Sequence, residues 1–449
     1  MRLYEMDNIE EIRNTTKKLL REGTPTSVEY EKALPLCKEL FDTFPETHDL
    51  WDVQQYANCL KKLNRLDEAE QVCEDVYSEF KDTEIVKTQS QAFLYIENLY
   101  AWIINDKYVK TIKQPDYKYS EMIFGKLTRL YDLLKDTKAT KPSFPYCALT
   151  VLKQLNKQKG KIMAAEGLEI LSLISLSELS SEAKSYTDSY GKTREFASLK
   201  EDYYTLKSDF LLDAKRYEDC IICCNEAMET LESFHYDNDI WFSRKISKSL
   251  GELGKIDDAI SKLEKLTIIS DKWFLLYEIG KYYLQLNNLD EALTYMLRAV
   301  CTKDPERMKV SLIESIGDLL TEIGDKSFAQ DNYNYARQIR QNNDWSVAYS
   351  LQGKITEEKE VASKDIKKKW IQKLYQISGS KRGKVIKLFN GKGGFIQANQ
   401  SYYFQFKNFF GKSDLLKIDD FVEFIVVNSY DKKRQIETKE AVAITPIRR

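Results

Sequence analysis

The sequence predicts a mainly α-helical protein, an array of helical hairpin repeats followed by a small five-stranded β-barrel. Glycine and proline are scarce, at 17 and 8 of 449 residues, which favours many helices over a large sheet protein. A helix–turn–helix pattern recurs along most of the chain. From about residue 380, short runs of β-branched and aromatic residues replace that pattern and predict strands.

The clearest helical hairpin carries Leu276, Ile279 and Tyr283 at intervals of three and four, so these side chains share one helix face. Two asparagines then break the pattern, and a second helix follows. Small residues, Gly280 in the first helix and Ala292 in the second, let two antiparallel helices approach closely. This spacing predicts a tightly packed helix pair.

The hairpin resembles the tetratricopeptide repeat, a helix–turn–helix unit with a period of 34 residues. Weaker copies of the pattern occur at residues 30–45, 53–76, 204–227, 246–266 and 313–336. We therefore predict repeats over residues 1–82 and again over residues 201–350. Residues 83–200 keep helical periodicity but lose the repeat pattern, which predicts irregular or elongated helices.

Stacked repeats of this family form a solenoid with a concave groove, and the resemblance implies that a protein or peptide partner binds there. By the family's geometry, the groove is lined by Trp241, Arg244, Lys248, Phe274, Tyr277 and Lys281. Interleaved aromatic and cationic side chains suit an acidic or carboxylate-ended peptide. The alternative is a set of ordinary solvated helix positions, because the Lys/Asn clamp of the members that bind chaperone tails is not reproduced.

The eight cysteines are thinly spread, and only Cys220, Cys223 and Cys224 lie together in the sequence. The repeat pattern places Cys37, Cys73 and Cys224 at one core position. We therefore expect buried free thiols rather than a disulfide framework. No second Cys pair or His cluster accompanies them, and the chain has only two histidines, so we expect no metal site.

The charge distribution divides the chain near residues 378–380, where we predict a linker. Residues 380–449 contain 14 Lys and Arg against 7 Asp and Glu, a net charge of +7. The preceding residues contain 54 against 63, a net charge of −9. The tail also holds 8 of the 20 phenylalanines, which argues against disorder. We predict a helix at residues 364–376 that caps the repeats, within a segment of residues 351–379, and a separate domain at residues 380–449.

Five runs in this tail predict strands, at residues 383–390, 394–398, 402–409, 421–427 and 441–447. Five short strands suit a small closed barrel of the OB type. The sequence GKVIKLFN, followed by KGGFI, resembles the opening of a cold-shock domain. The sequence YFQF resembles the second motif of that family, in which FVHF is usual.

The cold-shock resemblance implies a platform for single-stranded RNA or DNA, where aromatic faces stack on bases and lysines neutralise phosphates. The residues carried over are Lys387, Phe389, Lys392, Phe395, Tyr403, Gln405, Phe406 and Phe409. Among them, Phe395, Tyr403 and Phe406 are expected to stack, and Gln405 replaces the usual histidine. In the alternative interpretation, the aromatic side chains fill the barrel core or bind protein.

The sequence contains no catalytic motif. GKT at residues 191–193 and GKS at residues 411–413 end like phosphate loops, but the required first glycine is Tyr186 in one and Phe406 in the other. We therefore predict a non-enzymatic protein without a cofactor or metal. The start of the chain lacks the apolar run of a signal peptide, and the most apolar stretch is interrupted by charges. These features predict a cytoplasmic protein that does not span a membrane.

Together, the two parts predict an adaptor that binds a protein partner through its solenoid and single-stranded nucleic acid through its tail. The combination resembles large bacterial repeat proteins with an appended cold-shock-like module, some of which belong to nucleic-acid-centred defence systems. The alternative is a pure protein scaffold whose barrel is a second docking module. The basic tail and its aligned aromatic residues favour the adaptor, because a scaffold requires neither.

Overall fold

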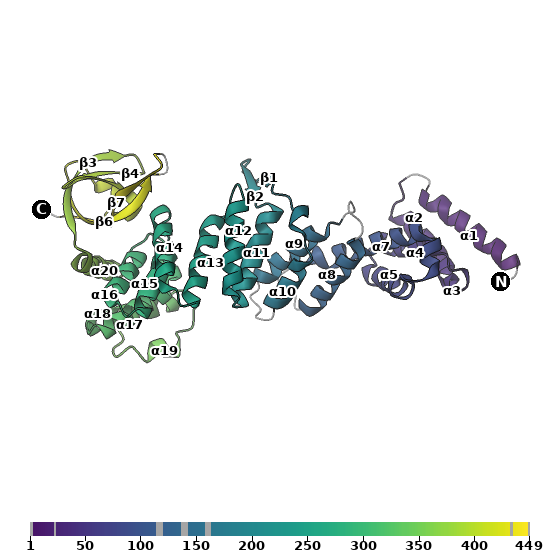
Figure 1. The fold of residues 1–449 in the computed structure, drawn as a ribbon, viewed down its shortest axis with the longest axis horizontal. Helices are drawn as coiled ribbons and strands as arrows, with labels where there is room; N and C mark the ends of the chain where they lie inside the picture. The colour runs from purple at the N-terminus through teal and green to yellow at the C-terminus, as the bar shows by residue number, and fades with distance from the viewer. Residues whose placement is uncertain are drawn as a thin grey trace. The chain divides into compact units, whose positions relative to one another are not determined.

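The computed structural model of this chain describes residues 3–21, 24–113, 120–135, 142–157, 163–431 and 434–447. Helices make up most of it, and a set of strands gathers near the C-terminus (Figure 1). The chain divides into two units, Met1–Tyr236 and Asp237–Arg449. The boundary falls inside the predicted repeat range 201–350, so hairpins of that range belong to both units.

The first unit consists of helices that pack mainly on their neighbours in the sequence, for example α4 on α5 and α11 on α12. A π-helical turn, Asn105–Val109, continues α7. The helices are α1 (Leu3–Arg21), α2 (Ser27–Asp42), α3 (Phe44–Thr47), α4 (Leu50–Lys62), α5 (Leu66–Phe80), α6 (Glu84–Thr88), α7 (Ser90–Ile104), α8 (Ser120–Leu134), α9 (Phe144–Lys157), α10 (Met163–Ser172), α11 (Leu199–Asp213) and α12 (Tyr217–Thr230).

A short antiparallel hairpin, β1 (Lys184–Thr187) and β2 (Thr193–Phe196), lies in the range where the sequence predicts only helices. The rings of Tyr186 and Phe196 stack across it, 4.2 Å apart. Gly191 adopts a positive φ of 75° in the connecting turn, and Asp188 accepts backbone N–H groups within that turn. The GKT sequence therefore belongs to a β-hairpin and not to a phosphate loop.

The second unit begins with three helical hairpins, α13 with α14, α15 with α16, and α17 with α18. A Cβ atom at Gly280 would lie 3.1 Å from the carbonyl oxygen of Ala292 and 2.8 Å from Met296. The predicted close approach at Gly280 and Ala292 is thus confirmed. The helices of this unit are α13 (Asn238–Glu252), α14 (Ile256–Ile269), α15 (Trp273–Gln285), α16 (Leu289–Val300), α17 (Val310–Glu322), α18 (Lys326–Gln341), α19 (Tyr349–Gln352) and α20 (Ser363–Ser378).

All eight cysteines are free and buried, as the repeat pattern predicts. The Sγ atoms of Cys37 and Cys59 lie 3.5 Å apart without a disulfide. Burial raises the pKa of Cys147 to about 12 and that of Cys301 to about 12. These two thiols therefore remain protonated at neutral pH and are poor nucleophiles. The cysteines fill the helical core.

Five strands close the second unit, and each overlaps one of the five predicted runs. They hydrogen-bond in the order β3-β4-β5-β7-β6, and β3 also pairs with β6, so the sheet forms a closed barrel. The β5–β7 pair is parallel and the other pairs are antiparallel. The strands are β3 (Lys381–Phe389), β4 (Gly393–Gln397), β5 (Ser401–Gln405), β6 (Phe421–Asp431) and β7 (Ile436–Pro446).

Two glycines allow the barrel backbones to cross closely. A Cβ atom at Gly393 would lie 1.9 Å from the carbonyl oxygen of Phe404. A Cβ atom at Gly394 would lie 2.0 Å from the carbonyl oxygen of Lys387. Gly393 also has a positive φ of 150°. Any side chain at either position would force β4 away from its neighbours, so the KGG sequence is a requirement of the barrel itself.

The barrel and the last helices share one hydrophobic core, which we call the joint. Ile425 of β6 and Ala443 of β7 are buried in it together with Trp370, Ile371 and Leu374 of α20. Residues 378–380 lead directly from α20 into β3, with Gly379 at a positive φ of 72°. The predicted linker is therefore a tight connection, because apolar residues on the outer face of β6 and β7 hold the barrel against α20.

Helix α20 also makes polar contacts at the joint. The indole Nε1 of Trp370 donates to Oδ1 of Asn332 at 2.8 Å. The hydroxyl of Tyr375 lies 2.8 Å from the carbonyl oxygen of Glu423 and contacts the carbonyl oxygen of Ala443. The β6–β7 register shifts between Glu423 and Ile425, so Tyr375 provides a donor where the sheet ladder is irregular.

We expect Tyr375→Phe to lower the free energy of unfolding by about 1–3 kcal/mol, because it leaves buried carbonyl oxygens without a donor. Urea unfolding followed by circular dichroism measures this change. The matched control is Tyr349→Phe, whose side chain is 89% exposed and which should change stability little. Equal stability of the two variants would contradict the role assigned to Tyr375.

Candidate nucleic-acid interface and neighbouring pocket

Three aromatic side chains form a row across the outer face of β3, β4 and β5. The ring centroids of Phe389 and Phe395 are 5.9 Å apart, and those of Phe395 and Tyr403 are 5.7 Å apart. Phe395 and Tyr403 are directly paired across the strands, as are Lys387 and Phe395. We call Phe389, Phe395 and Tyr403 the aromatic strip.

The strip faces outward because strand residues alternate between the two faces of a sheet. The neighbours of Tyr403 in the sequence, Tyr402 and Phe404, are buried in the barrel core at 2% and 0% exposure. Phe395 likewise precedes the fully buried Ile396. The three strip side chains are each partly exposed. A contiguous row of outward aromatic rings is a common feature of a binding surface.

Two lysines lie next to the strip. The ammonium group of Lys387 is 5.2 Å from the centroid of the Phe389 ring. Lys387 and Lys392 are exposed, and within the described ranges neither forms an ion pair. Lys384, on the same strand as Lys387, is instead paired with Asp419 at 2.8 Å. Lys387 and Lys392 therefore keep their full charge toward solvent.

Three other predicted residues do not join the strip. Phe409 is 5% exposed and belongs to the barrel core, and the ring of Phe406 packs edge-on against Phe404 at 5.8 Å. The amide of Gln405 donates to Glu440. The sequence predicts a strand through residue 409, but β5 ends at Gln405 and a 3₁₀ turn, Phe406–Asn408, follows. The alternation therefore stops, and Phe406 and Phe409 turn toward the interior.

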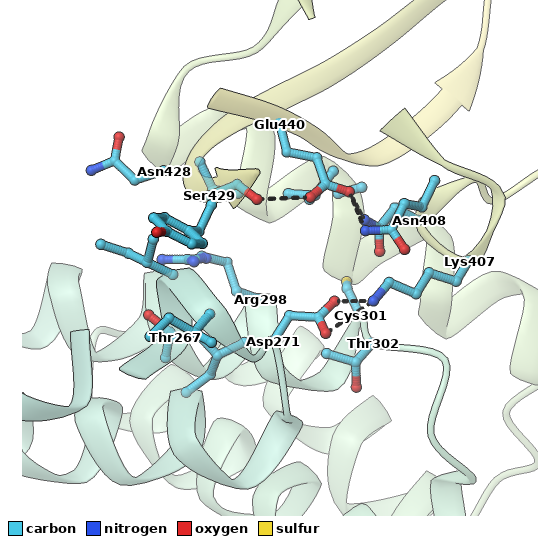
Figure 2. Close-up of a pocket in the computed structure, with 18 of the residues that line it drawn as sticks. Thr267, Asp271, Arg298, Cys301, Thr302, Lys407, Asn408, Asn428, Ser429 and Glu440 are labelled. Atoms are coloured by element: carbon cyan, nitrogen blue, oxygen red, sulfur yellow. Dashed lines mark hydrogen bonds and ion pairs between the residues drawn. The ribbon is translucent and has the colours of Figure 1, made fainter. Parts of the chain in front are cut away.

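A cavity of about 330 Å³ lies beside the strip, between the barrel and helices of the same unit (Figure 2). Glu440 of β7 is on the barrel side and Arg298 of α16 is on the helical side. Glu440 is paired across the strands with Tyr403, so it continues the outer face of the strip. It is nevertheless 8% exposed, because helices cover this half of the barrel.

The carboxylate of Glu440 accepts three hydrogen bonds. Oε1 accepts from Nε2 of Gln405 at 3.0 Å and from Nδ2 of Asn408 at 3.2 Å, and Oε2 accepts from the hydroxyl of Ser429 at 3.2 Å. Burial raises the pKa of the Glu440 carboxyl, although the bonds from Gln405 and Ser429 act in the opposite direction. The carboxylate is thus held in place by donors but remains costly to ionise.

Two cations line the pocket, Lys407 from the barrel side and Arg298 from the helical side. Lys407 is paired with Asp271 at 2.7 Å, which joins the barrel to the segment before α15. Arg298 lies 4.9 Å from the ring centroid of Tyr295 and has no ion pair among the residues that the structure describes. Burial lowers the pKa of the Arg298 guanidinium. The pocket lining therefore holds two cations and two carboxylates, of which Lys407 and Asp271 pair with each other.

The predicted groove residues lie on α13 and α15. The rings of Trp241 and Phe274 stack 5.1 Å apart with 8° between their planes, and the Arg244 guanidinium is 5.2 Å from each ring. Arg244 also donates to Glu278 at 3.0 Å, so its charge is already paired. The structure thus brings three of the six residues together as one stack.

The other three groove residues are not part of this stack. The ammonium group of Lys281 is 4.9 Å from the ring centroid of Tyr277. The Tyr277 hydroxyl is 2.7 Å from that of Ser315 on α17, which ties neighbouring hairpins together. Lys248 is exposed and has no ion pair within the described chain. The cations available on this surface are therefore Lys248 and Lys281 rather than Arg244.

Both histidines have structural partners. Nδ1 of His235 lies 2.7 Å from the buried carboxylate of Glu201, and Nδ1 of His48 lies 3.3 Å from the carbonyl oxygen of Phe44. In the described part of the chain, no three His, Cys, Asp or Glu side chains cluster so as to hold a metal ion. Of the helices that can be described, none has the length and apolarity needed to cross a membrane.

No protein-family model and no curated protein sequence matches the chain. Among solved structures, BtubC from P. vanneervenii is 12% identical, with a TM-score of 0.36, over 55% of this chain and 98% of that protein. Human IFIT1, solved as a dimer with m7Gppp-AAAA, is 13% identical, with a TM-score of 0.32, over 78% and 69% of the two chains. A tetratricopeptide repeat protein from Parabacteroides merdae is 10% identical, with a TM-score of 0.27, over 68% and 97%.

The class of the protein follows from its own elements. It is a mainly helical protein in which successive helices pack as hairpins, and a five-stranded barrel is packed on its last helices. The candidate sites are the aromatic strip, the adjacent pocket and the stack around Trp241. The sequence predicts the strip and the stack, whereas the pocket combines Arg298 and Glu440, which carry no shared motif.

We expect Glu440→Gln to change the free energy of unfolding more favourably at about pH 8 than at about pH 4, with a difference between the two pH values on the order of 1 kcal/mol. A carboxyl whose pKa is raised by folding lowers stability above its folded pKa, and this penalty disappears below the ordinary value of 4.5. Thermal unfolding at both pH values measures the difference. Glu437→Gln, at an exposed site on the same strand, is the control. A pH-independent effect of Glu440→Gln would contradict the assignment.

Proposed function

We propose that this protein is a non-enzymatic adaptor whose C-terminal barrel, of the OB and cold-shock type, binds single-stranded RNA or DNA. The observation that carries the proposal is the aromatic strip, with Lys387 and Lys392 unpaired beside it in the described structure. Aromatic faces stack on any base, and lysines neutralise phosphates. An unpaired strand offers a row of base faces along a charged backbone, which is the ligand that this surface fits.

The strand order supports the barrel type. Counted from β3, the order is first, second, third, fifth, fourth, with closure between the first and the fourth strand. OB barrels bind oligonucleotides on the face of their second and third strands. In this barrel those strands are β4 and β5, which carry Phe395 and Tyr403. The strip therefore lies on the face that this type of barrel uses.

The helical part of the adaptor supplies a site for a protein or peptide partner. Trp241 and Phe274 provide a flat aromatic surface on α13 and α15, and Lys248 and Lys281 provide cations near it. Such a surface suits a peptide with aromatic or apolar anchors and acidic flanking residues. Glu278 neutralises Arg244, so the peptide needs fewer acidic groups than the sequence alone predicts.

A pure protein scaffold is the second candidate function. The observation that favours it is the joint, since the barrel already uses the outer face of β6 and β7 to pack on helices. In that case, the aromatic strip is a second docking surface for protein. The two candidates differ in whether an oligonucleotide binds the strip.

We expect the full chain to bind labelled single-stranded RNA or DNA, and Phe395→Ala and Tyr403→Ala each to weaken binding by about 1–3 kcal/mol. Fluorescence anisotropy at low salt measures the affinities. Phe421→Ala is the control, because Phe421 is an aromatic residue of the same barrel, 45% exposed and outside the strip. Absence of binding by the unmodified chain would leave the scaffold as the function.

We expect Lys387→Met to reduce the slope of log affinity against log salt by about 0.7, the value for one phosphate contact with a single strand. Lys384→Met is the control on the same strand, because its ion pair with Asp419 leaves no free charge for a phosphate. Anisotropy titrations over a range of salt concentrations give both slopes. Equal slopes for the two variants would place the phosphate path away from Lys387.

A further inference from the structure

The β1–β2 hairpin projects from the helices of the first unit (Figure 1). All four residues of β1 and all four of β2 are exposed, so neither face of the hairpin is buried. A hairpin of two strands is at best marginally stable in water, and further strands or a packed face stabilise it. The hairpin is therefore a sheet that another strand can extend.

The backbone of β1 has a free edge. The N–H of Asp188 donates to the carbonyl oxygen of Lys192 at 3.0 Å, and hydrogen-bonded pairs recur at every second residue of an antiparallel ladder. Ser185 and Thr187 fall between these pairs, so their N–H and C=O groups point away from β2. In the part of the chain that the structure describes, no backbone group bonds to them from the other side.

The outer edge of β2 is already covered. Glu195 directs its carbonyl oxygen away from β1, and the hydroxyl of Tyr236 donates to that oxygen at 3.5 Å. The imidazole of His235 also lies 3.4 Å from the Glu195 carboxylate. An added strand therefore belongs beside β1.

The side chains along the free edge form a self-complementary set. Lys184, Tyr186 and Asp188 share one face, because side chains alternate along a strand. Tyr186 is 38% exposed and stacks on Phe196, which is 48% exposed. The ammonium group of Lys184 lies 5.8 Å from the ring centroid of Tyr146 and has no ion pair among the described residues. The edge thus presents a cation, an aromatic ring and an anion in that order.

We propose that β1 pairs antiparallel with β1 of a second copy of this chain, with the two Tyr186 residues opposite each other on a twofold axis. Each Ser185 then lies opposite Thr187 of the second copy, and these pairs form four backbone hydrogen bonds. Each Lys184 lies opposite Asp188 of the second copy. The two hairpins join into one four-stranded sheet.

The charges favour a second copy over a strand of another protein. A twofold contact matches each residue with another of the same set, so the pair of Lys184 and Asp188 forms twice. Asp188 already contacts Arg194 at 2.6 Å, and its carboxylate can accept more than one donor. No like charges within β1 are directly opposite in this register. A uniformly basic or acidic strand would instead place a like charge opposite Lys184 or Asp188.

This inference goes beyond the proposed function, because it uses no residue of the aromatic strip or of the Trp241 stack. The paired strands are four residues long, so we expect a weak association that depends on concentration. Sedimentation velocity at chain concentrations up to about 1 mM should show the mass rising from that of one chain toward twice that value. The mass of one chain at every concentration would overturn the proposal.

Proline substitutions distinguish the two edges of the hairpin. Thr187→Pro removes an outward N–H of β1 and places a ring against the second copy, while the bonds within the hairpin remain. We expect it to weaken the association at least tenfold. The matched control is Thr193→Pro, which removes an outward N–H of β2 and should associate as the unmodified chain does. Association that survives Thr187→Pro, or that is lost equally in both variants, would contradict pairing through β1.

Cross-linking tests the register. Directly opposite residues of such a pair have Cα atoms about 4.5 Å apart, within the range that a disulfide spans. With copper-catalysed oxidation by dissolved oxygen, Tyr186→Cys should form an interchain disulfide at least tenfold faster than Tyr190→Cys, whose native side chain is 92% exposed at the tip of the hairpin. The native cysteines are all buried, so they contribute little background. Equal rates for the two variants would exclude this register.

Charge reversal tests the pair of Lys184 and Asp188. Lys184→Glu places two carboxylates opposite each other at two places in the dimer, and we expect it to weaken the association about tenfold. Lys192→Glu makes the same change in net charge at an exposed residue of the turn, outside the paired strands. It should have a much smaller effect, and equal effects of the two variants would refute the proposed pairing.

Discussion

The outer face of β6 and β7 is buried against helix α20, and the arrangement of the C-terminal unit depends on this burial. Ile425 and Ala443 point out of the barrel into the core formed by Trp370 and Leu374. The barrel therefore has one covered half and one free half. Because β3, β4 and β5 lie on the free half, the aromatic strip stays open to solvent in the described structure.

The border between the two halves creates the unusual chemistry of the pocket. Glu440 belongs to the outer face of the sheet, where a carboxylate would ordinarily be hydrated, but the helices remove that water. Three donors replace the water only in part, since burial still raises the pKa of the carboxyl. Burial likewise disfavours the charged form of Arg298 on the helical wall, where it lowers the pKa of the guanidinium.

Local pattern was enough to predict the helical hairpins, the five strands and the outward position of Phe395 and Tyr403, because alternation and three-four spacing are local properties. Phe409 was misplaced because nothing in the run of residues 402–409 marks the end of β5 at Gln405. The pocket was beyond prediction, since Arg298 and Glu440 meet only through the joint. One signal was available: FIVV at residues 424–427 is apolar on both faces, which indicates a strand covered on both sides.

The net charge of each part, together with the pairing of its charges, explains why a polyanion would select the barrel. In the helical part of the second unit, Arg244, Lys354 and Lys369 are each paired with a carboxylate, whereas Lys248 and Lys281 have no ion pair within the described residues. On the free half of the barrel, Lys387 and Lys392 have no such partner within the residues described. The carboxylate of an ion pair cancels most of the electrostatic field of its cation beyond the pair. An unpaired cation attracts phosphate over about a Debye length, roughly 8 Å in physiological salt. In the proposed function, the basic tail attracts nucleic acid through the lysines beside its aromatic strip, while the body, which has 63 Asp and Glu against 54 Lys and Arg, repels it.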